Sequence, residues 1–117
     1  MTSFRKLHLF AAFFSFLLLA SAVDAAEDPA QMKQKANADV QTGAQIMQKA
    51  FQTIQGNPSA EARQVAVTLF VQAGQLFEEA TNLYKALVPQ YATVEDVQNA
   101  QSAMAQCIQA IQKIRAA

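Results

Sequence analysis

An aliphatic residue followed by an aromatic residue recurs every seven positions between residues 69 and 84, and this repeat limits the possible folds more than any other feature. The three pairs are Leu69 and Phe70, Leu76 and Phe77, and Leu83 and Tyr84. Seven residues make two turns of an α-helix, so the repeat predicts one long helix with a broad apolar stripe. Because a coiled-coil seam needs only two apolar columns, the added aromatic column predicts a helix that packs against more than one neighbour.

Residues 1–25 have the composition of a cleaved signal peptide. Two basic residues precede an almost unbroken apolar run at residues 9–20, and small residues follow that run. The run is shorter than the roughly 20 residues that a membrane-spanning helix needs, so cleavage is expected and a stable membrane anchor is not. Cleavage after Ala25 is preferred to cleavage after Ala22. The sequence therefore predicts a secreted or periplasmic protein.

Removal of the leader changes the charge and the chemistry of what remains. The only histidine, His8, would leave, together with two of the nine basic residues and one of the nine acidic residues, so residues 26–117 would carry a formal charge of −1. Nucleic acids and anionic lipids are bound by clustered Lys and Arg, and this balance argues against both as partners. About 90 residues are enough for one modest core, so residues 26–117 are expected to form a single domain.

Start and stop signals divide residues 26–117 into three helices, expected at about 29–55, 58–88 and 94–115. The signals are an N-cap aspartate before a proline, a glycine after the first helix, a proline after the second and a Thr-x-x-Asp capping box before the third. They fall at Asp28 and Pro29, at Gly56, at Pro89, and at Thr93 and Asp96. Short connections place consecutive helices side by side and antiparallel, so the fold class is all-α, an elongated antiparallel three-helix bundle.

The first and third helices each carry an apolar seam at helical spacing. The first seam comprises Val40, Ala44, Met47, Phe51 and Ile54, and the third helix offers Val94, Val97, Met104, Ile108 and Ile111, with Ala100, Cys107 and Ile114 in the adjacent column. A column of glutamines lies beside the first seam at residues 41, 45, 48, 52 and 55. We interpret it either as a hydrated outer face or as a source of amide hydrogen bonds between helices. Gly43 is expected to lie close to another helix, near Phe70.

Catalytic and metal-binding residues are sparse once the leader is removed. No histidine remains as a base or ligand, and the haem-attachment pattern C-x-x-C-H is absent. The adjacent acids Glu78 and Glu79 point about 100° apart on a helix and cannot converge on one reacting atom. We therefore expect no enzyme activity, no cofactor and no metal. Cys107 is interpreted either as a small buried hydrophobe or as the source of an intermolecular disulfide.

Two valines indicate a candidate partner-binding surface. Val67 and Val71 fall outside the stripe that neighbouring helices should cover, and exposed apolar patches commonly mark protein interfaces. The alternative is that the third helix covers them. The function predicted from sequence is therefore protein–protein interaction or self-association without catalysis. The second hypothesis is a carrier of an apolar small molecule, in which Phe70, Phe77 and Tyr84 would line a cavity between the helices.

Overall fold

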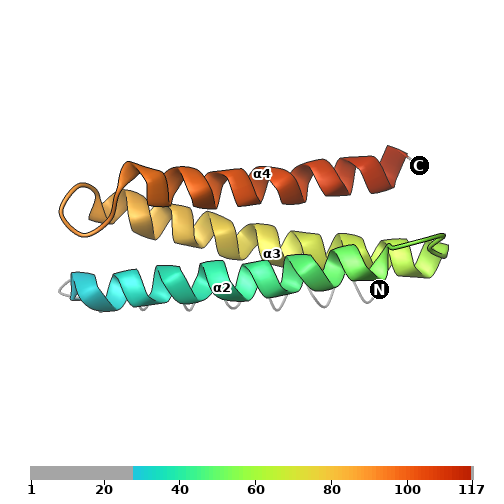
Figure 1. The fold of residues 1–117 in the computed structure, drawn as a ribbon, viewed down its shortest axis with the longest axis horizontal. Helices are drawn as coiled ribbons and strands as arrows, with labels where there is room; N and C mark the ends of the chain where they lie inside the picture. Colours follow the sequence, from blue (N-terminus) through green and yellow to red (C-terminus); the bar gives the residue numbers. More distant parts are fainter. Residues whose placement is uncertain (1–27, 117) are drawn as a thin grey trace.

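A computed structural model of the protein describes residues 28–116, and this part of the chain is helical without any strand. The three helices are α2 at Pro29–Thr53, α3 at Ala60–Leu87 and α4 at Val94–Ala116 (Figure 1). Their packing is that of a bundle, as the apolar periodicity predicts. The signal peptide predicted at residues 1–25 lies outside the described residues.

Side-chain caps begin each helix near the position expected from sequence. The Asp28 carboxylate accepts a hydrogen bond from the amide of Ala30, and the Ser59 hydroxyl accepts one from the amide of Ala62. At α4, the capping box is reciprocal: the Thr93 amide donates to the Asp96 carboxylate and the Asp96 amide donates to the Thr93 hydroxyl, both at 3.0 Å. These bonds satisfy amide groups that have no partner inside the helix.

Helix α3 is the central element and packs along its length against both α2 and α4 (Figure 1). The chain reverses direction at each connection, so α2 and α4 run parallel to each other on either side of α3. Their backbones barely approach each other. Side chains bridge the gap instead, because the Cys107 sulfur of α4 lies 3.6 Å from the Met47 sulfur of α2.

The buried face of α3 is the aromatic column together with a column of alanines. Its buried apolar residues at alternating steps of four and three are Ala66, Phe70, Ala73, Phe77, Ala80, Tyr84 and Leu87. Leu69, Leu76 and Leu83 are only half-buried and flank this seam. The sevenfold ladder is thus confirmed as the inner stripe of the central helix, with the aromatic rings at its centre and the leucines at its edge.

Small residues occupy the centres of the α2 and α4 seams, which corrects the seams expected from sequence. The buried residues are Ala36, Gly43 and Ala50 in α2, and Ala100, Cys107 and Ala110 in α4. Ala44 and Phe51, expected in the α2 seam, are exposed, and so are Val94 and Ile108 of α4. The reason is volume, because the large rings of α3 leave room only for small side chains opposite them. Gly43 does face α3, but it meets Phe77 rather than Phe70.

Candidate functional site

Displacement of the two seams leaves an apolar row on each outer helix. We call the first the α2 row, and it comprises Val40, Ala44, Met47 and Phe51. The second, the α4 row, comprises Val97, Met104, Ile108 and Ile111. Cys107 lies against Gly74 of α3. Burial raises the pKa of Tyr84, and the Asp96 carboxylate is close enough to contribute to this rise. Because the α4 row projects from the side of the helix opposite Asp96, it points away from α2, and the two rows are separate surfaces.

Three members of the two rows are open to solvent and the others are half-buried. In the α2 row Phe51 is 43% exposed and Ala44 is also exposed, and in the α4 row Ile108 is 48% exposed. Val40, Met47, Met104 and Ile111 are partly buried because they also pack on the core beneath. Each row therefore packs on the core on one side and has no cover on the other among the described residues.

Phe51 is held in place despite its exposure. Its ring packs edge-to-face against the buried ring of Phe70, with centroids 4.8 Å apart and planes at 75°. An exposed aromatic ring with a fixed orientation loses little conformational entropy when a partner covers it, which is a common property of residues that dominate binding. Phe51 is therefore the strongest single anchor in the α2 row.

Uncharged amides lie beside both rows. The neighbouring glutamines are exposed, and they are Gln41, Gln48 and Gln55 on α2 and Gln101 and Gln112 on α4. The glutamine column predicted from sequence is confirmed as exposed, so its amides are available to a partner.

The structure separates the two valines that sequence reasoning grouped. Val67 is only 8% exposed, whereas Val71 is 38% exposed. Val67 borders a shallow depression together with Ile114 and Arg115 of α4. For Val67 the structure matches the alternative left open by the sequence, coverage by the third helix, because the C-terminal part of α4 reaches this level of α3. Val71 remains accessible as a single apolar side chain.

The three aromatic residues proposed to line a ligand cavity fill the core instead. Phe70 and Phe77 are fully buried, and Tyr84 is nearly so. The Tyr84 hydroxyl donates a hydrogen bond to the Asn37 side-chain oxygen, which joins α3 to α2. Neither the depression beside Val67 nor a second one at the α3–α4 connection is lined by any of these three residues.

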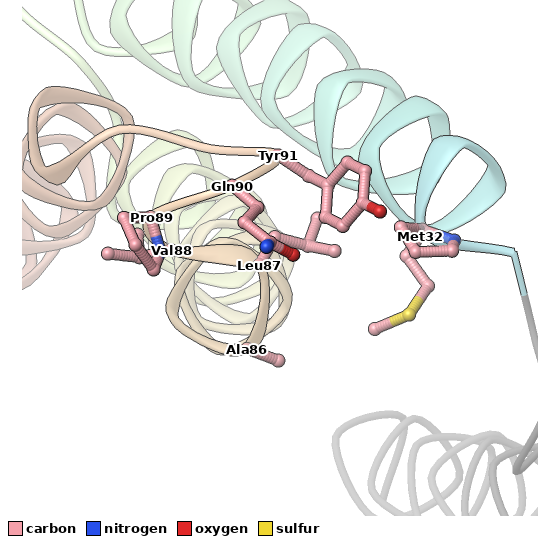
Figure 2. A pocket seen from close by; sticks show the side chains of 8 residues that line it. Met32, Ala86, Leu87, Val88, Pro89, Gln90 and Tyr91 are labelled. Carbon is pink, nitrogen blue, oxygen red and sulfur yellow. The ribbon is translucent and has the colours of Figure 1, made fainter.

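One of these depressions lies at the end of the bundle, where the α3–α4 connection meets the first turn of α2. Figure 2 shows the Tyr91 ring lying between the connection and Met32, with Leu87, Val88 and Pro89 on the other side. Its volume is about 310 Å³, and it is broadly open to solvent. Its lining residues offer no charged group that would orient a ligand, so the shape alone carries little chemical specificity.

A half-buried carboxylate, Asp39, lies between α2 and α3 at some distance along the bundle from Phe51. One of its oxygens is buried and has no hydrogen-bond partner among residues 28–116. Burial raises the pKa of Asp39 to about 7, with a further contribution from the Glu79 carboxylate, while the Lys35 ammonium acts in the opposite direction. Lys35 itself pairs with Glu79 at 3.5 Å. Sequence reasoning missed this group, since a single aspartate beside an apolar seam gives no local signal.

Cys107 is a free thiol in the core rather than an exposed one. It is 1% exposed, and its Cβ lies near Gly74 of α3. Burial raises the pKa of this thiol to about 11, so it stays protonated at neutral pH. Of the two interpretations left open by the sequence, burial favours the small packed hydrophobe, because a disulfide to a second chain would require α4 to move away from α3.

Comparisons with known proteins add no relative. The chain was compared with protein-family models, with curated proteins and with solved structures, and no match was found.

Within residues 28–116, no group of three or more His, Cys, Asp or Glu side chains is placed to hold a metal ion. No helix in this range combines the length and the apolar character needed to span a bilayer. The α2 row, with the fixed ring of Phe51, is the candidate site on which the functional argument rests.

Proposed function

We propose that this chain is a small exported helical protein that works by protein–protein interaction or self-association, without catalysis. The observation that carries the proposal is the α2 row, where Phe51 remains 43% exposed although its ring packs on the buried ring of Phe70. When a partner covers an apolar row of this kind, apolar surface is removed from water, and this burial is favourable in free energy. The fixed ring of Phe51 supplies an anchor, and the bordering glutamines supply hydrogen bonds.

Packing of the aromatic column favours interaction over the carriage of a small apolar molecule. A carrier needs an enclosed space, whereas Phe77 packs directly against the backbone of Gly43 and Phe70 packs against Phe51. The centre of the bundle is occupied by these side chains, and the apolar surface available for binding is on the outside. Binding on an external strip suits a protein partner better than a small molecule, whose surface is normally mostly enclosed.

Export is the second part of the proposal, and it rests on the composition of residues 1–25 alone. Native mass spectrometry of the protein purified from its own source, with and without reductant, tests both parts. We expect a mass that corresponds to loss of about 22–25 N-terminal residues, and a complex with protein that survives reduction. A monomer that retains a small apolar molecule would instead support the carrier hypothesis. An uncleaved leader would contradict export.

A further inference from the structure

We infer that the depression between the first turn of α3 and the last turn of α4 binds a carboxylate that is attached to a small apolar group. Its lining residues are Ala60, Arg63, Gln64 and Val67 of α3 and Ile114 and Arg115 of α4. In Figure 1 this is the end of the bundle at which the chain passes from α2 to α3 and at which the last residues of α4 lie. The site shares no residue with the α2 row, so it goes beyond the proposed function and does not depend on it.

The first argument is the pair of guanidinium groups that line one depression. Arg63 is half-buried in the first turn of α3, and Arg115 is exposed in the last turn of α4. Neither forms an ion pair with a carboxylate among residues 28–116, where the ion pair that is present joins Lys35 to Glu79. A guanidinium is planar and permanently charged, and its N–H groups match the two oxygens of a carboxylate. Two such groups on neighbouring helices can therefore hold one anionic group between them.

The second argument is the uneven distribution of charge along the bundle. The half that contains the depression, residues 44–73 and 104–116, has four basic residues and one acidic residue. The other half of the described chain, residues 28–43 and 74–103, has three basic residues and six acidic residues. At the depression, the positive end of the α3 dipole and the negative end of the α4 dipole oppose each other. The side chains therefore decide the sign of the local potential, and a positive potential attracts an anion.

The third argument is the apolar part of the depression, which decides what the anion carries. Val67 is 8% exposed and Ile114 is half-buried, whereas Ala60 and Gln64 are exposed at the margin. The volume is about 280 Å³, close to the lower end of the roughly 300–1,000 Å³ that is typical of small-molecule sites. An inorganic anion would leave the two apolar side chains in contact with water, whereas an apolar group on the carboxylate covers them. The chemistry therefore fits a short fatty acid or the carboxyl end of a peptide that closes on an apolar residue.

Amide chemical shifts of the isotope-labelled chain, expressed from its full sequence and purified, test the inference with one probe for each source. The probes are sodium hexanoate and N-acetyl-alanyl-leucine, and their neutral counterparts are hexanamide and the amide of the same dipeptide. We expect at least one acid to bind about fivefold more tightly than its neutral counterpart, with the largest shift changes at Val67 and Ile114. We expect sodium acetate, which lacks the apolar group, to bind about tenfold more weakly than hexanoate if hexanoate is the acid that binds. The acid that binds identifies the source.

Arg63→Gln and Arg115→Gln test the two guanidinium groups one at a time. Glutamine is nearly as good a helix former as arginine, and Arg115 is exposed near the end of α4, so the second variant leaves the core undisturbed. We expect each variant to weaken binding of the acid about fivefold and to leave binding of the neutral counterpart unchanged. Lys113→Gln is the matched control, because it removes the same charge from an exposed position of α4 that does not line the depression.

The outcomes separate this inference from the proposed function. Failure of both acids to bind, or equal affinity for an acid and its neutral counterpart, would overturn the inference. A Lys113→Gln chain that binds as weakly as the Arg115→Gln chain would also overturn it, because net charge alone would then explain the attraction. The proposed function stands after either result, since it depends on the α2 row. Absence of any protein partner in the native mass spectrum would instead overturn the proposed function and leave this site unaffected.

Discussion

The ring of Phe77 lies so close to Gly43 that a Cβ added at the glycine would be 3.0 Å from two ring carbons. Phe77 is fully buried, so the ring has little room to move aside. This contact sets the separation of α2 and α3 at the middle of the bundle. It also explains why a glycine is present inside a long helix, where it costs about 1 kcal/mol relative to alanine.

Gly43→Ala should therefore fail to stabilise the protein, although alanine is the better helix former. The crowding of Phe77 costs about 1–3 kcal/mol, which exceeds the gain of about 1 kcal/mol in helix propensity. Gly74→Ala is the matched control, because a Cβ at Gly74 meets Cys107 at an ordinary 3.7 Å. We expect Gly74→Ala to raise the free energy of unfolding in urea and Gly43→Ala to lower it. Equal stabilisation by both would show that Phe77 is free to move.

The carboxyl group of Asp39 should make the stability of the bundle depend on pH near neutrality. Its pKa is about 7 in the folded chain, above the ordinary value of 3.8, because of burial first and the Glu79 carboxylate second. The folded state therefore binds a proton more tightly than the unfolded state. Stability from this group is fully present below the unfolded pKa and is lost as the pH rises through about 7.

Asp39→Asn should remove this dependence and stabilise the protein at pH 8. Asp39 is only half-buried, and solvent screens its charge, so we expect a gain on the order of 1 kcal/mol rather than the full value of the shift. Glu78→Gln, at an exposed position of α3, is the control and should leave the pH profile unchanged. Urea unfolding between pH 5 and pH 8 provides the measurement. A wild-type chain that becomes more stable over this rise in pH would contradict the account.

The thiol of Cys107 should react slowly with alkylating reagents in the folded protein. Burial both blocks access and keeps the thiol protonated, and the thiolate is the reactive form. The control is a chain with Cys107→Ala and Ala105→Cys, which moves the thiol to an exposed position on the same helix. We expect this control to be modified rapidly without denaturant and the natural chain only after unfolding. Similar rates for the two chains would show that α4 opens readily from α3.

Sequence periodicity was sufficient to predict the helices, their caps and the buried aromatic column, because each depends on local chemistry and on one strong repeat. It misplaced the seams of α2 and α4. Hydrophobic patterns give most weight to large side chains, such as Phe51 and Ile108, whereas packing against Phe70 and Phe77 requires small ones. Complementary volume is a property of two helices together, and neither sequence segment reveals it alone. The same shift leaves Phe51 exposed in the α2 row, so sequence reasoning missed the candidate site for this reason.

Oxidative crosslinking of a single introduced cysteine tests the central claim most directly, because it reports which residues meet in the assembly. The chain carries Cys107→Ala, so that the new thiol is alone, and either Ala44→Cys in the α2 row or Val65→Cys on α3. If two copies of the chain meet through the α2 row, Ala44→Cys gives a covalent dimer on mild oxidation and Val65→Cys stays monomeric. Efficient crosslinking through Val65→Cys with none through Ala44→Cys would contradict the account.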